Sequence, residues 1–263
     1  MFDGRDLLTL PERERVALRG TAMSMVFQDP MSSLHPFFTI GDQIIEAHQV
    51  HNSVSKEVSA NKAVELLKKV GISEPELRMK SFPHQFSGGM RQRVMIAMAL
   101  INEPELLIAD EPTTALDVTV QAQILKLLKE LQQEMQMAII LISHDLGVVA
   151  GAADRVNVMY AGRIVESAKV DDLFAKPLMP YTSGLLASIP KPESDIERLS
   201  VIPGQPPSLL HVPKGCAFHP RCSYSDRVVG GSDLCKNNEP ELVEKASNHF
   251  ARCHLGSSVV LQK

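Results

Sequence analysis

The stretch Leu106-Leu-Ile-Ala-Asp110-Glu111-Pro112 decides the fold class, because a short apolar run ends in two adjacent carboxylates. Such a run, bounded by polar or turn residues, is too short for a typical helix and indicates a buried strand. A similar run occupies residues 138–142, and residues 118–135 between the two place apolar side chains at helical spacing. Strand, helix and strand in this order predict a parallel crossover unit, hence an α/β fold in which both strands are fully buried.

The remaining sequence divides into an α/β part and a tail. A further strand is expected over residues 23–27, and the stretch from about 37 to 102 has the spacing of an inserted helical subdomain. A hairpin around Ala161-Gly162 and two short helices, over 170–175 and 181–188, follow. Prolines interrupt residues 190–220. We therefore expect an α/β domain over 1–189 and a loop-rich extension over 190–263.

Composition excludes several classes of protein. The chain has 263 residues, of which 44% are hydrophobic and 22% charged, which is enough for a sizeable core and argues against disorder. With 27 basic and 31 acidic residues the formal net charge is −4, so no overall basic field favours a nucleic-acid partner. The sequence lacks a bilayer-spanning apolar run and the pattern of a signal peptide, so we expect the chain to stay in the cytoplasm.

A glycine motif precedes one of the predicted helices. In Phe86-Ser-Gly-Gly-Met90, Ser87 is placed to cap the apolar helical run that follows, and Gly88 and Gly89 leave backbone N–H groups open at the positive end of that helix. This arrangement suits an anion. An ordinary capped helix with a Gly-Gly turn is the alternative.

The carboxylates after the first strand have a partner after the next one. Asp110 can hold Mg²⁺ through water, and Glu111 can orient a water molecule toward a phosphoryl group. His144 follows the strand at 138–142, so adjacent parallel strands would bring its imidazole to the same edge of the sheet. A solvated acidic turn and a structural histidine are the alternatives for each motif taken alone.

Taken in order, these motifs resemble the ATP-binding subunits of ABC transporters, in particular those of bacterial oligopeptide and dipeptide importers. The resemblance implies an ABC ATPase fold of the P-loop NTPase type, with ATP and Mg²⁺ as cofactors. It assigns general-base catalysis to Glu111 and contact with the γ-phosphate to His144. The other matching positions are Gln28 of the Q-loop, Ser87, Gly88 and Gly89 of the signature motif, Asp110 of Walker B, and Asp117 of the D-loop, Ala115-Leu116-Asp117.

The same resemblance implies a role and a set of partners. The role is to bind and hydrolyse ATP and so energise peptide import across the bacterial inner membrane, from a peripheral position on its cytoplasmic face. The partners are a second ABC ATPase subunit, two transmembrane permease subunits and an extracytoplasmic peptide-binding protein. The membrane subunits would contact the region around Gln28.

One motif of the family is absent from the sequence. A phosphate-cradling P-loop reads G-x-x-x-x-G-K-[ST], and this sequence contains no Gly-Lys dipeptide. We therefore expect an N-terminally incomplete ATPase domain that alone neither binds ATP tightly nor hydrolyses it. A non-catalytic subunit that lends only its signature motif to a partner's ATP site is an alternative. An ABC-type ATPase acting on DNA or ribosomes is another, but the chain lacks the long coiled-coil insertions or tandem cassettes of those proteins.

All four cysteines, Cys216, Cys222, Cys235 and Cys253, lie in the tail. Their spacing lacks the paired knuckles of common zinc sites, whereas an iron–sulfur cluster requires only four convergent thiolates. The tail also resembles that of peptide-importer subunits with a [4Fe–4S] cluster. The cluster is therefore the expected ligand. Zinc and free thiols remain alternatives. In a zinc site, one of four nearby histidines could replace a thiol: His211, His219, His249 or His254.

Overall fold

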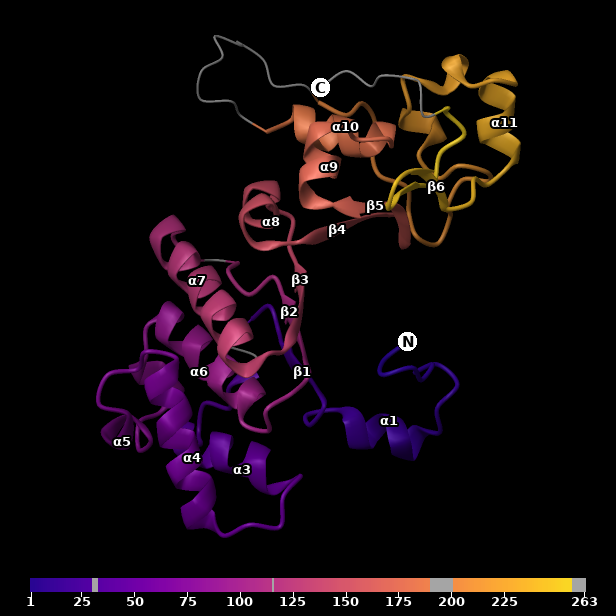
Figure 1. Ribbon diagram of the computed structural model, residues 1–263. Coiled ribbons are helices and arrows are strands. Elements are labelled where there is room, and N and C mark those ends of the chain that lie inside the picture. The colour runs from indigo at the N-terminus through magenta and orange to yellow at the C-terminus, as the bar shows by residue number, and fades with distance from the viewer. Residues whose placement is uncertain (30–32, 115, 190–200, 257–263) are drawn as a thin grey trace. The chain divides into compact units, whose positions relative to one another are not determined.

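The computed structural model describes residues 1–29, 33–114, 116–189 and 201–256 (Figure 1). The chain divides into two compact units, Met1–His144 and Asp145–Lys263. Within the described residues, no helix combines the length and the apolar character needed to cross a lipid bilayer.

A parallel three-stranded sheet forms the centre of the first unit. Its order is β1 (Met23–Val26), β2 (Leu106–Asp110) and β3 (Ala138–Ile142). The strands predicted over residues 23–27, 105–109 and 138–142 are confirmed to within one residue at each end. Helix α7 (Val118–Met135) connects β2 to β3 and has the bounds that its apolar spacing predicts. Because the register pairs Asp110 with Ile142, the carboxyl ends of β2 and β3 lie side by side.

The stretch between β1 and β2 is helical, as its periodicity predicts. Thr39 and Ser55 cap α3 and α4 by accepting hydrogen bonds from the backbone N–H groups of Asp42 and Val58. These caps supply partners for N–H groups that a helix cannot satisfy internally. In the described part of this unit, the α-helices outside the strand connection are α1 (Glu12–Leu18), α3 (Ile40–Gln49), α4 (Lys56–Lys69), α5 (Pro75–Arg78) and α6 (Gly88–Leu100).

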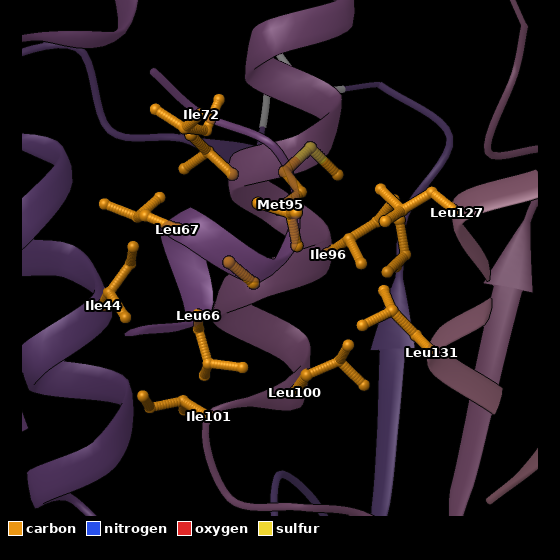
Figure 2. Packing of buried hydrophobic residues seen from close by; sticks show 14 of the residues in the cluster. Ile44, Leu66, Leu67, Ile72, Met95, Ile96, Leu100, Ile101, Leu127 and Leu131 are labelled. Carbon is orange, nitrogen blue, oxygen red and sulfur yellow. The ribbon is translucent and has the colours of Figure 1, made fainter. Parts of the chain in front are cut away.

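The main core lies where these helices meet one face of the sheet. Figure 2 shows Met95, Ile96 and Leu100 of α6 between side chains of α4 and α7. Ile96 and Leu100 are fully buried, as is Leu107 on the adjoining face of β2. The helical part and the sheet therefore share a single apolar core, which sets the position of the start of α6 relative to the strands.

The opposite face of the sheet carries exposed apolar side chains. Met25, Ile140 and Ile142 are 37%, 50% and 45% exposed. Along the strands they alternate with the residues that face the core. Helices α3, α4, α6 and α7 all lie on the other side of the strands (Figure 1). The expectation that residues 138–142 are fully buried is therefore wrong, because in the described structure only one face of β3 packs against the core.

The second unit is built on an antiparallel sheet of order β4-β5-β7-β6. The hairpin predicted around Ala161-Gly162 is present, and β7 adds a strand from the tail to its free edge. The tail is thus less loop-rich than expected. The elements of this unit are α8 (Leu146–Ala152), β4 (Arg155–Tyr160), β5 (Arg163–Lys169), α9 (Val170–Ala175), α10 (Pro180–Ala187), the 3₁₀ turns η2 (His219–Arg221) and η3 (Ser225–Arg227), α11 (Gly231–Asn237), β6 (Val243–Ala246) and β7 (His249–Ala251).

A buried carboxylate ties the tail to the hairpin. Glu166 of β5 is fully buried, and its Oε1 lies 2.7 Å from Nε2 of His249 at the start of β7. The same carboxylate accepts hydrogen bonds from the backbone N–H groups of Leu178 at 2.6 Å and Met179 at 3.1 Å. Because a buried charge is costly unless it is paired, these three donors make Glu166 the polar anchor between β5, β7 and the start of α10.

We expect His249→Ala to destabilise the second unit by about 3 kcal/mol, because it removes the side-chain partner of a buried carboxylate. Urea unfolding followed by circular dichroism measures this loss. The control is His254→Ala, which removes an exposed histidine of the same tail whose Nε2 lies 2.9 Å from the Asn238 carbonyl oxygen. Equal effects of the two substitutions would contradict the anchoring role.

Candidate functional site

The carboxylate of Glu111 lies at the centre of the candidate site. Its Oε1 is 2.9 Å from Nδ1 of His144, and its Oε2 accepts hydrogen bonds from the Gln28 amide at 2.7 Å and the Thr114 hydroxyl at 2.8 Å. The expectation that Glu111 and His144 share one edge of the sheet is confirmed. Three segments that are far apart in the sequence, following β1, β2 and β3, thus meet at one side chain.

Thr114 is a contact that the sequence interpretation missed. Its backbone N–H also donates to the Glu111 carbonyl oxygen at 3.1 Å, so residues 111–114 form a turn directly after the strand. A proline followed by two threonines after Glu111 is the local signal for this turn. This turn brings the Thr114 hydroxyl within hydrogen-bond distance of the Glu111 carboxylate.

The backbone at Glu111 adopts a conformation uncommon for a residue with a side chain. Its φ is +44°, in the left-handed region, while its N–H continues the sheet ladder by donating to the Ile142 carbonyl oxygen at 3.0 Å. Left-handed non-glycine residues cost free energy and are enriched at functional sites. This conformation redirects the chain immediately beyond the strand and presents the Glu111 side chain to its three donors.

The hydrogen bonds also determine the charge state of the carboxylate. The His144 ring nitrogen, and secondarily the Thr114 hydroxyl, lower the pKa of Glu111 below its usual value. Hydrogen bonds donated to the charged form favour that form. Glu111 is therefore ionised at neutral pH, which a general base requires. The His144 side chain is 75% exposed and that of Glu111 is 22% exposed, so the pair is open to a ligand.

Asp110 is the last residue of β2 and lies directly before this cluster. One carboxylate together with substrate phosphates is a common way for proteins to hold Mg²⁺. The position at the carboxyl end of a buried parallel strand is also where open α/β sheets bind ligands. Asp110 thus fits the role of a magnesium ligand.

The residues of the glycine motif form a second cluster at the start of α6. Ser87 caps this helix by accepting a hydrogen bond from the Met90 N–H at 3.3 Å, as predicted. A Cβ atom added to Gly89 would lie 2.7 Å from Cγ1 of Val120, whereas one added to Gly88 would meet Leu116 at an ordinary 3.6 Å. The absence of a side chain at residue 89 therefore lets the start of α6 approach α7 closely.

Asp117 acts as the cap of α7 in this structure. Its carboxylate accepts a hydrogen bond from the Val120 N–H at 3.0 Å. Asp117 therefore fixes the helix start against which Gly89 packs. Ala115, in the predicted D-loop, lies outside the described residues.

The four cysteines of the tail lie in the apolar core of the second unit. Cys216 and Cys235 are buried, and Cys222 and Cys253 pack against the same cluster. Burial raises the pKa of Cys216 to about 11 and that of Cys222 to about 12. Within the described ranges, no group of three or more Cys, His, Asp or Glu side chains is arranged to hold a metal ion. The structure therefore does not support the expected [4Fe–4S] cluster or the zinc alternative.

Three of the four histidines predicted as possible zinc ligands lie within hydrogen-bond distance of oxygen atoms. His249 is engaged with Glu166, as described above, and Nδ1 of His219 lies 2.8 Å from the Cys216 carbonyl oxygen. Nε2 of His254 lies 2.9 Å from the carbonyl oxygen of Asn238. These histidines stabilise the local fold of the tail.

Comparisons with known proteins identify the family of this chain. The family model for ABC transporters matches residues 1–114, and the model for the C-terminal region of oligopeptide/dipeptide transporters matches residues 165–227. The chain is 53% identical to the oligopeptide transport ATP-binding protein OppD of Salmonella typhimurium, over 96% of this chain and 73% of that protein. It is 49% identical to the dipeptide transport ATP-binding protein DppD of Escherichia coli, over 96% of this chain and 76% of that protein.

Solved structures show the same fold. The ATP-binding cassette MJ0796, in a dimeric post-hydrolysis state bound to ADP and Pi, aligns with a TM-score of 0.54 and 30% identity, covering 62% of this chain and 68% of that chain. The fold and the carboxylate site therefore define an ABC ATPase. Within that class, the chain belongs to the family of ATP-binding proteins of oligopeptide and dipeptide ABC transporters.

In the metal-free chain, His144→Ala is expected to raise the pKa of Glu111 toward its usual value, because it removes the largest cause of the shift. A carboxyl group whose pKa is lowered in the folded state keeps its hydrogen bonds at pH values above its unfolded pKa. It loses them as the pH falls through the lowered pKa. A pH titration of the Glu111 side-chain carbon resonance measures the shift. Thr114→Ala should raise this pKa less, and an unchanged value in His144→Ala would refute the assignment.

Gly89→Ala is expected to destabilise the first unit by about 1–2 kcal/mol, because the added methyl group meets Val120 in a packed core. Gly88→Ala is the matched control, since alanine favours a helix by up to about 1 kcal/mol over glycine and has space here. Urea unfolding compares the two. The double variant Gly89→Ala, Val120→Ala should recover stability; no recovery would show that the close approach is not the cause.

Proposed function

We propose that this chain energises peptide import across a bacterial inner membrane by binding and hydrolysing ATP. The observation that supports this most strongly is the ionised Glu111 carboxylate beside Asp110, held by Gln28, Thr114 and His144 at one edge of the sheet. The relatives named for oligopeptide and dipeptide transport support the substrate class.

In this proposal the residues of the sheet edge divide the work of phosphoryl transfer. Asp110 would hold Mg²⁺, which neutralises charge on the transferring phosphate. Glu111 would orient the attacking water and accept its proton. His144, whose imidazole is largely exposed, would donate to the γ-phosphate. Gln28 lies in the loop that follows β1, so binding of a ligand at the site would affect this loop through the Gln28 side chain.

The glycine motif supports a shared site. Ser87, Gly88 and Gly89 present the open N-terminal end of α6, an α-helix of 13 residues, which favours a bound anion. We propose that this end completes the ATP site of a second ABC ATPase subunit. Two transmembrane permease subunits and an extracytoplasmic peptide-binding protein complete the assembly, and the chain is peripheral on the cytoplasmic face.

We also propose that the ATPase domain runs over residues 1–189, with 190–263 as its C-terminal extension. The change in composition at residue 190 supports this division. The pairing of β7 with β5 supports an extension that folds together with the preceding hairpin rather than apart from it. The proposed function does not depend on a metal cluster in this extension.

A non-catalytic role is the second candidate, and one observation favours it. The given sequence contains no Gly-Lys dipeptide, which the P-loop pattern requires. In this alternative the chain contributes only its signature motif to the ATP site of the partner. The retained geometry around Glu111 favours the catalytic role.

Reconstitution with the permease subunits and the second ATPase separates the two candidates. We expect Glu111→Gln to lower ATP hydrolysis and peptide uptake by at least about 100-fold, since general-base catalysis contributes that much or more. Gly88→Asp, which places a negative charge at the signature helix, should also abolish activity. Glu105→Gln, at an exposed position just before β2, is the control.

Loss of activity in Gly88→Asp with full activity in Glu111→Gln would establish the non-catalytic role. Full activity in both variants would contradict both candidates.

The isolated chain, titrated with a fluorescent ATP analogue and Mg²⁺, provides the reference for binding. We expect weak binding there, and low-micromolar affinity would show that the residues of this chain bind ATP without a Gly-Lys dipeptide.

A further inference from the structure

A cavity of about 210 Å³ opens in the second unit and contains none of the residues assigned to ATP. Its apolar lining includes Tyr160 of β4, Val165 of β5, Met179 and Phe218, all of which are less than a tenth exposed. An apolar cavity of about 150 Å³ takes up benzene. The cavity therefore has room for a branched aliphatic or an aromatic side group, and is too small for a nucleotide.

Charged side chains of both signs also line this cavity. Arg163 and Arg252 each donate from a guanidinium nitrogen to Oε1 of Glu239, the second at 3.3 Å. Arg252 is further fixed by the carbonyl oxygens of Ile164 at 3.1 Å and Pro240 at 3.0 Å. Glu239 is thus shared by two guanidinium groups and neutralises only one of their two charges.

Lys214 adds a third positive charge to the lining. It is exposed, and its ammonium group has no hydrogen bond or ion pair with any residue in the described part of the chain. Three cations and one carboxylate leave an excess of two positive charges next to an apolar floor. An anion can therefore bind without removing an existing partner from Lys214.

The loop that carries Lys214 is held in place on the protein. The N–H of Cys216 donates to the Cys235 carbonyl oxygen at 2.8 Å, and Gly215 has a φ of +69°. A Cβ atom at Gly215 would lie 2.4 Å from the same carbonyl oxygen, so only glycine permits this close approach. The backbone on both sides of the cavity wall is therefore fixed before any ligand arrives, which lowers the cost of binding.

We propose that this cavity binds a small carboxylate that carries one apolar side group. The carboxylate pairs with Lys214 and with the charge of Arg163 that Glu239 leaves unbalanced. The side group occupies the space over Val165, Met179 and Phe218. An N-acylated amino acid, the C-terminal residue of a peptide and a medium-chain fatty acid share this chemistry. Because the ligand would bridge the loop at 212–218 to the β4–β5 hairpin, its binding stabilises the second unit.

Isothermal titration calorimetry of the full chain tests this site with matched probes. N-acetyl-leucine has the carboxylate and the side group, whereas the neutral N-acetyl-leucinamide has the same side group and an amide in place of the carboxylate. We expect one N-acetyl-leucine per chain, with a rise in the melting temperature, and no binding of N-acetyl-leucinamide. Octanoate distinguishes the sources: tighter binding of octanoate assigns the site to fatty acids, and tighter binding of N-acetyl-leucine assigns it to amino-acid derivatives.

Variants of the lining make the test specific. Lys214→Met should weaken binding of N-acetyl-leucine at least about fivefold, because it removes a charge-assisted hydrogen bond. Lys176→Met, at an exposed lysine of the same unit outside the cavity, should leave binding unchanged. Val212→Trp, at a lining position that is 40% exposed, should block entry without disturbing the core.

Three results would overturn the proposal. The first is the absence of heat and of a thermal shift with every carboxylate at about 10 mM, a concentration at which even millimolar affinity is detected. The second is equal binding of N-acetyl-leucinamide and N-acetyl-leucine, which would remove the role of the carboxylate. The third is equal weakening by Lys214→Met and Lys176→Met, which would place the charge effect outside the cavity.

Discussion

The convergence of three donors on the Glu111 carboxylate is the constraint on which the arrangement of the first unit depends. Gln28 follows β1, Thr114 closes the turn after β2, and His144 follows β3. These residues meet because the three strands are parallel and adjacent, so that their carboxyl ends share one edge. A shift in the register of β1 or β3 would separate donors and carboxylate. The left-handed conformation of Glu111 belongs to the same constraint, since it turns the chain where the strand ends.

The helices position the second element of the site through the same core. Helix α6 packs between α4 and α7, and the bare backbone of Gly89 lets its start approach Val120 of α7 (Figure 2). Because α7 begins only a few residues after Glu111, the cap at Asp117 fixes the start of α7, against which α6 packs, close to the segment that follows the carboxylates. The second unit has its own polar anchor in Glu166, which holds the tail strand β7 and the start of α10. Each unit thus combines an apolar core with one carboxylate whose donors come from distant parts of the chain.

Sequence patterns were most informative where local spacing decides structure. The bounds of α7 agree with its apolar periodicity, and the cap at Ser87 follows from a serine before two glycines. They were least informative where partners are distant. The continuous apolar run at residues 138–142 has the pattern of a strand covered on both faces. The exposure of Ile140 and Ile142 instead depends on which elements cover the sheet. The pairing of β7 with β5 joins residues about eighty positions apart, which no local pattern encodes. The cysteines show the same limit, since their number and spacing suggested convergence on a metal.

The sequence by itself determined the class of this protein, because the order of its motifs and the alternation of strands and helices reflect spacing along the chain. The tertiary structure decided which atoms meet. It assigned the amide of Gln28 and the hydroxyl of Thr114 to Glu111, and it placed Lys214 beside an apolar cavity in the second unit. It also arranged the four thiols without a metal-binding group in the described residues. The physical reason is that hydrogen bonds and ion pairs require approach within a few ångströms, and for residues far apart in sequence only the packing of the elements determines that distance.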